Sequence, residues 1–223
     1  MAFVVYPRME GDMITYLEQQ THGMIAETEL ALFVRSAVRA LWTLHIDLKI
    51  AHNDIKPENF LFRRGRHGRL DFRLCDFGLA STEVGALLPG RVHARNHKVI
   101  GTPKFCAPEM INGELVTNAS VEELARADMW SFGMTLYYVL TLGRCGLPFR
   151  ISRDQYLDRL SQRQKMSAAD YDCELKYLFM KRARVIHRMP MFHQLCYRII
   201  ARLLCFDPKK RMTVVGVARL IGE

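Results

Sequence analysis

The sequence lacks any long hydrophobic run. Its N-terminal apolar stretch, AFVVY at residues 2–6, is shorter than a membrane-spanning helix and has neither the basic flank nor the cleavage pattern of a signal peptide. We therefore expect a cytoplasmic or nuclear protein with no membrane partner. The remaining composition, 49% hydrophobic and 25% charged over 223 residues, is typical of a globular chain with a sizeable core.

Paired cysteine motifs are also absent. The six cysteines form no CxxC pair, and no histidine accompanies them at zinc-finger spacing. Most of them lie in apolar surroundings, so the pattern predicts reduced core thiols rather than a disulfide framework. The cysteines are Cys75, Cys106, Cys145, Cys173, Cys196 and Cys205.

Acidic residues are few relative to basic ones, with 23 Asp and Glu against 32 Lys and Arg and a net charge of +9. Such an excess favours acidic partners, which include phosphates, acidic peptides and nucleic acid. The basic residues do not form one stripe with interleaved aromatic residues, so we do not expect nucleic-acid binding. They are spread over residues 63–69, 91–98, 181–188 and 209–211.

Helical periodicity dominates the chain. Asp12 is placed to cap a short helix, and Thr28 is placed to cap a longer one. The stretch at 128–140 is apolar on nearly all sides, as a helix through the centre of a core would be. The helices predicted after the first cover residues 28–47, 128–140, 191–206 and 213 onward.

Two short strands are predicted near the middle of the chain, over residues 59–62 and 70–75. Periodicity is then lost over residues 76–109, where Gly, Pro, Ser and Thr are frequent. A loop of this length is usually either functional or disordered. No domain boundary stands out, so residues 1–223 are expected to form a single, mainly α-helical α+β domain.

Polar side chains stand at fixed offsets in the stretch IAHNDIKPENFLF. A hairpin with Asp54 at its entry and Asn59 on its first strand can aim both side chains into one cleft. A carboxylate can orient a hydroxyl or accept its proton, and Asp and Asn oxygens suit magnesium. Lys56 can neutralise phosphate charge, and the second strand brings another carboxylate, Asp76.

This pattern resembles the eukaryotic protein kinase family. HNDIKPEN followed by DFG is similar to the catalytic loop and the magnesium loop of that family, and Lys56 in DIKPEN is typical of its serine/threonine class. Further family landmarks follow in order, and together they span residues 50–213. They are GTPKFCAPE at 101–109, DMWSFG at 128–133, GLPF at 146–149 and DPKKRMT at 207–213.

The resemblance implies a role for each matched residue. Asp54 would orient the hydroxyl of the protein substrate and take its proton, and Lys56 would contact the transferred phosphate. Asn59 and Asp76 would hold Mg²⁺, and Gly78 would let the loop change conformation. ATP would then be the nucleotide, and a protein bearing Ser or Thr would be the partner.

Other matched residues would support this site. Thr102 would hydrogen-bond near the catalytic aspartate and lysine and shape the floor on which the substrate docks. His52 would support the catalytic loop rather than act as a base, and Asp128 would brace that loop from below. Glu109 and Arg211 would form a buried ion pair that ties the activation segment to the lobe.

Two further positions carry specific interpretations. For Cys75 we favour a small buried strand residue, and the alternative is a thiol that lines the nucleotide pocket. Asn53 stands where most family members have an Arg that binds a phosphorylated residue of the activation segment, about residues 76–109. An Asn cannot supply that charge, so an active protein is not expected to depend on that phosphorylation.

The resemblance covers only the large lobe of the family. No GxGxxG precedes residues 2–6, which resemble the last strand of the small lobe running into the hinge. We therefore expect a kinase-like C-terminal lobe with a short β-hairpin and without the small N-terminal lobe. The apolar edge at residues 2–6 would then be exposed.

Two explanations of this pattern remain open. The chain is a serine/threonine kinase reduced to its hinge and large lobe, or it is a kinase-like, non-catalytic module with a binding or regulatory role. A separate small-lobe or regulatory partner protein acting in trans is a third, less favoured, possibility. The intact set of Asp54, Lys56, Asn59 and Asp76 favours an active parent, although the isolated chain is expected to phosphorylate poorly or not at all.

Overall fold

The computed structural model describes residues 7–20, 23–82, 101–113, 119–144, 147–149 and 188–223, with a few single residues between 155 and 186. The edge strand expected at residues 2–6 lies outside the described residues. So do the basic cluster at 91–98 and nearly all of the one at 181–188. Within the described part, the chain is mainly helical with a small antiparallel sheet, in agreement with the predicted fold class.

The sheet has three strands in the order β1-β3-β4, namely β1 (Gly11–Asp12), β3 (Phe60–Arg64) and β4 (Leu70–Leu74). The strands β3 and β4 form the predicted hairpin within one or two residues. Phe60, Phe62 and Phe72 are buried on one face, because alternate side chains of a strand point to opposite faces. This face covers the helical core.

The short first helix is as the sequence predicts. Asp12 caps α1 (Met13–Glu18), and its carboxylate accepts a hydrogen bond from the backbone N–H of Thr15 at 2.8 Å. The side chains of Met13, Tyr16 and Leu17 are buried, so this cap fixes the helix against the aromatic face of the hairpin.

The cap predicted for the second helix was wrong. Helix α2 (Glu27–Trp42) begins after Ala26, which makes no side-chain cap, and Thr28 therefore lies inside its first turn. Glu27 and Glu29 place negative charge in that turn, which favours a helix start without a capping side chain. A π-helical turn, η1 (Thr43–Asp47), continues the helix to its predicted end.

Helix α4 (Val121–Leu140) passes through the centre of the core and starts seven residues before its predicted beginning. Its N-terminus is a capping box. The Ser120 hydroxyl accepts from the backbone of Glu123, and the Glu123 carboxylate accepts from the backbone of Ser120 at 2.9 Å. The Ser-x-x-Glu pattern was visible in the sequence and could have located this boundary.

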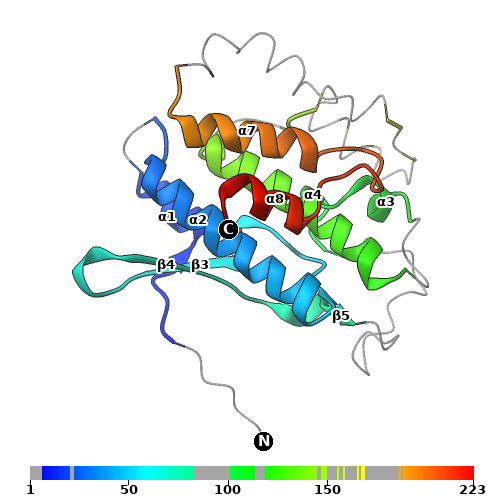
Figure 1. The fold of residues 1–223 in the computed structure, drawn as a ribbon, viewed down its shortest axis with the longest axis horizontal. Coiled ribbons are helices and arrows are strands. Elements are labelled where there is room, and N and C mark those ends of the chain that lie inside the picture. Colours follow the sequence, from blue (N-terminus) through cyan, green and yellow to red (C-terminus); the bar gives the residue numbers. More distant parts are fainter. Residues whose placement is uncertain are drawn as a thin grey trace, which may run out of the picture.

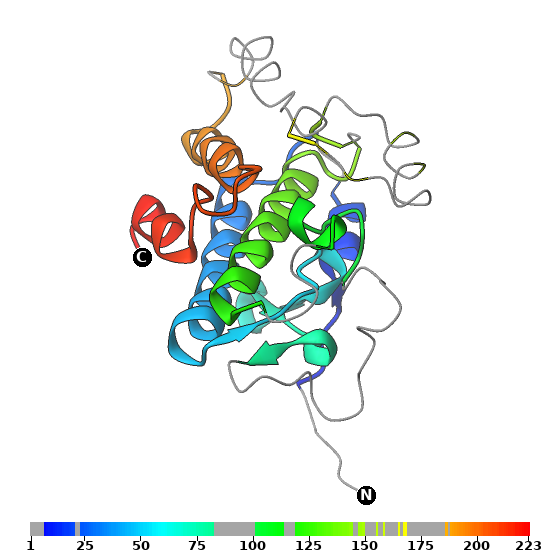
Figure 2. The same ribbon diagram turned by 90° about the vertical axis from the view of Figure 1, so that its right-hand side faces the viewer.

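The remaining helices complete the packing around α2 and α4. Helix α2 contacts strand β4 on one side and the helices α7 (Met191–Leu203) and α8 (Val214–Ile221) on the other, as Figure 1 shows. Helix α4 packs on α7, and Figure 2 shows it between α2 and the short α3 (Pro108–Ile111). No helix among the described residues is both long and apolar enough to cross a membrane.

The cysteines that the structure describes are free thiols, as predicted. Cys106 and Cys196 are buried in the core, whereas Cys75 and Cys205 are half-buried. Burial raises the pKa of the Cys106 thiol to about 12, so that thiol stays protonated at neutral pH. Cys106 and Cys196 therefore act as small apolar core residues.

Candidate active site

The predicted catalytic loop starts at the end of a two-residue strand and rests on α4. Strand β2 (Ile50–Ala51) pairs antiparallel with β5 (Ser81–Thr82). Directly after β2, the backbone N–H groups of His52 and Asn53 donate to the buried Asp128 carboxylate at 2.7 and 2.8 Å. Asp128 also contacts His45 Nε2 at 2.9 Å. The central helix therefore holds this loop from below, where the sequence interpretation placed Asp128.

His52 joins the loop to the end of strand β4. Its Nδ1 accepts from the backbone of Asp54 at 3.3 Å, which leaves Nε2 to donate to the Cys75 carbonyl at 3.0 Å. Its ring also lies 5.1 Å from the Phe77 ring, centroid to centroid. Both ring nitrogens are thus used by the backbone, which suits a supporting residue and not a base.

Asp54 lies at the centre of a compact polar cluster with Lys56 and Thr102. One carboxylate oxygen accepts from Lys56 Nζ at 2.7 Å, and the other accepts from the Thr102 backbone and hydroxyl at 2.9 and 2.8 Å. Lys56 Nζ also donates to the Thr102 hydroxyl at 2.9 Å. Thr102 is distant in sequence, so the fold brings three predicted site residues into direct contact.

The environment of Asp54 keeps its carboxylate ionised. Burial on its own raises the pKa of this group, but hydrogen bonds from Lys56 and Thr102 outweigh burial and hold the pKa below its ordinary value. An acceptor with a low pKa holds a proton weakly. The carboxylate is therefore ionised at neutral pH and can accept a hydrogen bond from a hydroxyl.

Replacing Lys56 by Met tests this balance. We expect the variant to lose about 1.5–3 kcal/mol of unfolding free energy at pH 7, because a buried carboxylate loses a charged hydrogen-bond partner. A carboxyl group with a depressed pKa stabilises the fold at pH values above its ordinary pKa, which is 3.8 for an aspartate. This contribution is lost as the pH falls through the lower pKa of the folded state. The difference in unfolding free energy between Lys56→Met and wild type should therefore become smaller near pH 3.

Denaturant unfolding at pH 7 and pH 3 measures this difference. Lys210→Met is the matched control, since the Lys210 side chain is 79% exposed and lies 3.8 Å from Asp207. A Lys56→Met deficit of equal size at both pH values would show that Lys56 acts by packing and not through the Asp54 charge.

Asn59 and Asp76 lie close together along the backbone, where strand β3 begins and strand β4 ends. The backbone N–H of Cys75 donates to the Asn59 carbonyl at 2.9 Å, so Asp76 follows immediately after the residue that pairs with Asn59. The Asn59 amide nitrogen donates to the Asp54 carbonyl at 2.7 Å and lies 3.3 Å from its carboxylate. Its side-chain hydrogen bonds within the described residues use this nitrogen, which leaves its oxygen for a cation.

A family model described as the protein kinase domain matches residues 1–219. The chain belongs to the protein kinase family. It is 34% identical over 151 residues to a serine/threonine-protein kinase of Drosophila yakuba, which covers 67% of this chain and 17% of that protein. It is 30% identical over 198 residues to the CBL-interacting protein kinase 16 of Oryza sativa subsp. japonica, covering 88% of this chain and 35% of that protein. The chain thus spans about a third or less of these relatives.

Membership of the kinase family implies ATP and Mg²⁺, and the oxygen donors present fit such an ion. Asn59 and Asp76 offer an amide oxygen and a carboxylate, and Mg²⁺ in kinases takes its remaining ligands from water and phosphate oxygens. Within the described part of the chain, no three His, Cys, Asp or Glu side chains are grouped as an all-protein metal site. The donor set therefore suits a magnesium ion that arrives with phosphates.

Asp76 has the backbone conformation of a strained site residue. Its φ of 62° lies in the left-handed region, which costs most non-glycine residues energy but is tolerated by Asp. Its carboxylate accepts from the Gly78 backbone at 3.2 Å. Asn53 in the predicted catalytic loop has a φ of 64°, so both segments of the candidate site hold a left-handed residue.

A cavity of about 810 Å³ adjoins Asp76 on the face of the hairpin opposite to the core. Leu61 and Cys75 line it with Pro7 and Met9, and this apolar floor has room for a nucleotide base. Cys75 is thus half-buried in the wall of this cavity. Burial, followed by the charge of Asp76, raises the pKa of its thiol and disfavours the reactive thiolate.

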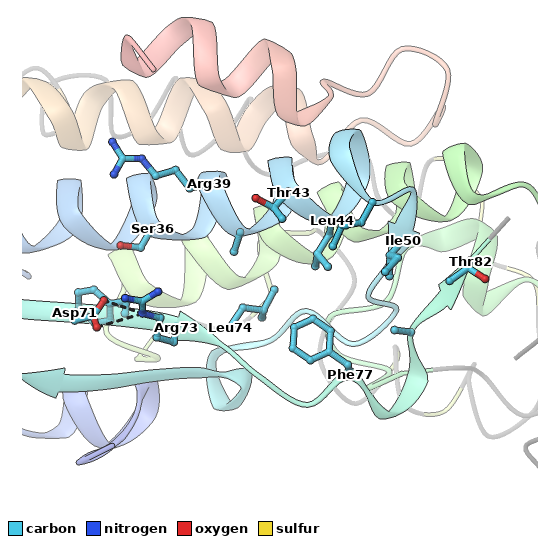
Figure 3. Close-up of a pocket in the computed structure, with 14 residues that line it drawn as sticks. Ser36, Arg39, Thr43, Leu44, Ile50, Asp71, Arg73, Leu74, Phe77 and Thr82 are labelled. Atoms are coloured by element: carbon cyan, nitrogen blue, oxygen red, sulfur yellow. Dashed lines mark hydrogen bonds and ion pairs between the residues drawn. The ribbon is translucent and has the colours of Figure 1, made fainter. Parts of the chain in front are cut away.

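A second cavity, of about 790 Å³, lies between α2 and β4. Figure 3 shows Leu44, Ile50, Leu74 and Phe77 around it. It shares Arg73, Leu74 and Phe77 with the first cavity, but Asp76 lines the first cavity and not the second. The first cavity is therefore the candidate site for the nucleotide.

The predicted ion pair between Glu109 and Arg211 is present and buried. Arg211 Nη2 donates to Glu109 Oε2 at 3.0 Å, and its guanidinium also reaches the carbonyls of Arg126 at 2.8 Å and Cys205 at 3.1 Å. The same group lies 5.1 Å from the Trp130 ring centroid. The pair connects α3, at the end of the activation segment, to the loop before α8.

The sequence interpretation missed two contacts of this site. The contact of His45 with Asp128 could not be predicted from the sequence, because it depends on the π-helical turn that orients the His45 ring toward Asp128. The side chain of Asn53 was considered only as the absence of an Arg. In the structure it hydrogen-bonds to Leu79 and Ser81 in the activation segment.

Proposed function

We propose that this chain carries the catalytic half of a serine/threonine protein kinase, which transfers a phosphoryl group from ATP to hydroxyls of a protein substrate. The observation that carries this proposal is the contact of Asp54, Lys56 and Thr102 beside Asn59 and Asp76. Family membership and the serine/threonine kinases among the relatives support it.

Each side chain has a defined part in this proposal. Asp54 receives a hydrogen bond from the substrate hydroxyl, aligns its oxygen and takes its proton as the new bond forms. Lys56, held between Asp54 and Thr102, neutralises charge that develops on the transferred group. Asn59 and Asp76 would hold Mg²⁺, which neutralises phosphate charge when bound.

The Asn59 contact also argues against a purely non-catalytic module. Asn59 is buried and uses its amide nitrogen on Asp54, so its side-chain oxygen is left for another ligand such as a cation. A binding module would gain little from keeping two oxygen donors suited to magnesium. We therefore favour the enzyme over the non-catalytic alternative, together with the substrate partner and nucleotide that it requires.

The 223 residues alone should transfer phosphate poorly. They contain no GxGxxG, and the cavity beside Asp76 is an open floor for the nucleotide. Kinases cover the phosphates with a glycine-rich loop and pair them with a strand Lys. We propose that a further segment of a longer chain or a separate small-lobe partner supplies these parts as a complement.

The proposal is tested by measuring phosphate transfer from labelled ATP to a mixed Ser/Thr peptide library, with and without Mg²⁺. The 223-residue chain is compared with the longest natural form of the protein that contains it. We expect Mg²⁺-dependent transfer by the longer form and a rate at least about a hundredfold lower for the chain alone, the scale of losing phosphate positioning. Equal Mg²⁺-dependent rates would overturn the need for a complement. No transfer by the longer form would favour the non-catalytic alternative.

A further inference from the structure

The Asn53 side chain bridges the catalytic loop to the start of the activation segment. Its Nδ2 donates to the Leu79 carbonyl at 2.8 Å and to the Ser81 hydroxyl at 2.7 Å. Because a carbonyl oxygen can only accept, the bond to Leu79 fixes which end of the amide faces the segment. We call these two hydrogen bonds the Asn53 latch.

The backbone of Asn53 is held on two further sides. Its N–H donates to Asp128 at 2.8 Å, and its φ of 64° lies in the left-handed region that Asn tolerates. Gly101, with a φ of 92°, lies so close that a Cβ there would be 2.5 Å from the Asn53 carbonyl oxygen. Asn53 is therefore clamped between α4 and both described parts of the activation segment.

The segment that the latch holds has little other support from strand pairing. Strands β2 and β5 are two residues each, with Ala51 opposite Ser81 and Ile50 opposite Thr82. So short a two-stranded pair is marginal on its own. The side-chain bonds from Asn53 therefore contribute a large share of what keeps β5 on the catalytic loop.

We propose that Asn53 is a positioning residue, whose latch holds the start of the activation segment on the catalytic loop without any phosphate. Two neutral hydrogen bonds here take the place of an attraction between a charged loop residue and a phosphoryl group. Asp76 lies in the same short connection, so the latch also fixes the position of the predicted metal ligand. This consequence for catalysis rests on the proposed function, whereas the latch itself does not.

Hydrogen exchange of the backbone amides of residues 79–82 tests the latch without any activity. Asn53→Gly is the main variant, because it removes the side chain and still permits a positive φ. We expect these amides to exchange about tenfold faster, the effect of losing roughly one net hydrogen bond. Exchange within α4 should stay unchanged.

Three substitutions in β5 sharpen this test. Ser81→Ala removes one of the two bonds and should speed exchange less than Asn53→Gly does, whereas Ser81→Thr keeps the hydroxyl and should behave as wild type. Thr82→Ala is the matched control, since Thr82 is the exposed neighbour on the same strand. Ser81→Ala should add nothing in the Asn53→Gly background, because the two residues share one interaction.

A kinetic arm with the longest active form separates the latch from the proposed function. We expect Asn53→Gly to lower kcat about tenfold with an unchanged KM for ATP, and phosphatase treatment of wild type to leave kcat unchanged.

Exchange at residues 79–82 that is the same in Asn53→Gly and wild type would overturn the latch. Faster exchange with an unchanged kcat would overturn its positioning role, and loss of wild-type kcat after phosphatase treatment would overturn its independence from phosphate. An inactive wild type with the predicted exchange pattern contradicts the proposed function and leaves the latch supported.

Discussion

Asp54→Asn should lower the phosphotransfer rate of the longest active form about 10²–10⁴-fold, the range contributed by a positioned acid or base. The substitution preserves the size of the side chain, so the cluster around it can keep its shape. It removes the negative charge that accepts from Lys56 at 2.7 Å and replaces one acceptor oxygen by a donor. The substrate hydroxyl then loses both its orienting acceptor and the place for its proton.

The expected change lies in kcat and not in the binding of ATP, because Asp54 is not among the residues lining the cavity assigned to the nucleotide. Asp71→Asn is the matched control, since Asp71 is a half-exposed hairpin carboxylate that pairs with Arg63 and Arg73. Its rate should stay within about twofold of wild type, as for exposed ion pairs of little net strength. An Asp54→Asn enzyme with near wild-type kcat would remove Asp54 from the chemistry.

Arg211→Met should cost about 3–5 kcal/mol of unfolding free energy, because it leaves the Glu109 carboxylate buried without its partner. The Arg211 side chain is fully buried and Glu109 is 4% exposed, so water cannot take over the lost interaction. The carbonyls of Arg126 and Cys205 lose a donor at the same time. A loss of this size is a large part of the 5–15 kcal/mol that stabilises a typical domain.

Urea unfolding followed by circular dichroism measures this cost, with Lys210→Met as the exposed neighbouring control at under about 0.5 kcal/mol. The double variant Glu109→Leu and Arg211→Met should recover part of the loss, because two apolar side chains can replace a buried pair without leaving a charge behind. A double variant that is less stable than Arg211→Met alone would show that the carbonyl contacts of Arg211, and not the pairing of charges, carry its effect.

The comparison of pattern and structure is clearest at the helix termini. Asp12 was correctly predicted as a cap because its helix begins directly after it, with three apolar residues at helical spacing. Thr28 was a wrong choice, since two glutamates in the first turn favour a helix start two residues earlier, with Ala26 at the cap position. Helix α4 was predicted too short, because its prediction rested on the apolar run alone and not on the Ser120 and Glu123 capping pattern.

The primary structure alone was sufficient for the protein kinase family and the hairpin, and it supplied the candidate site residues. Residues that are close in sequence can be brought together by one loop, and Asp54, Lys56 and Asn59 lie within six positions. The tertiary structure was required for contacts between segments far apart in sequence, such as Asp54 with Thr102. The tertiary structure also shows that Asn53, which the sequence marked only as the absence of an Arg, donates a hydrogen bond to Ser81. Such contacts depend on how separate segments pack against each other, and the spacing of residues within one segment does not determine which distant residue it will contact.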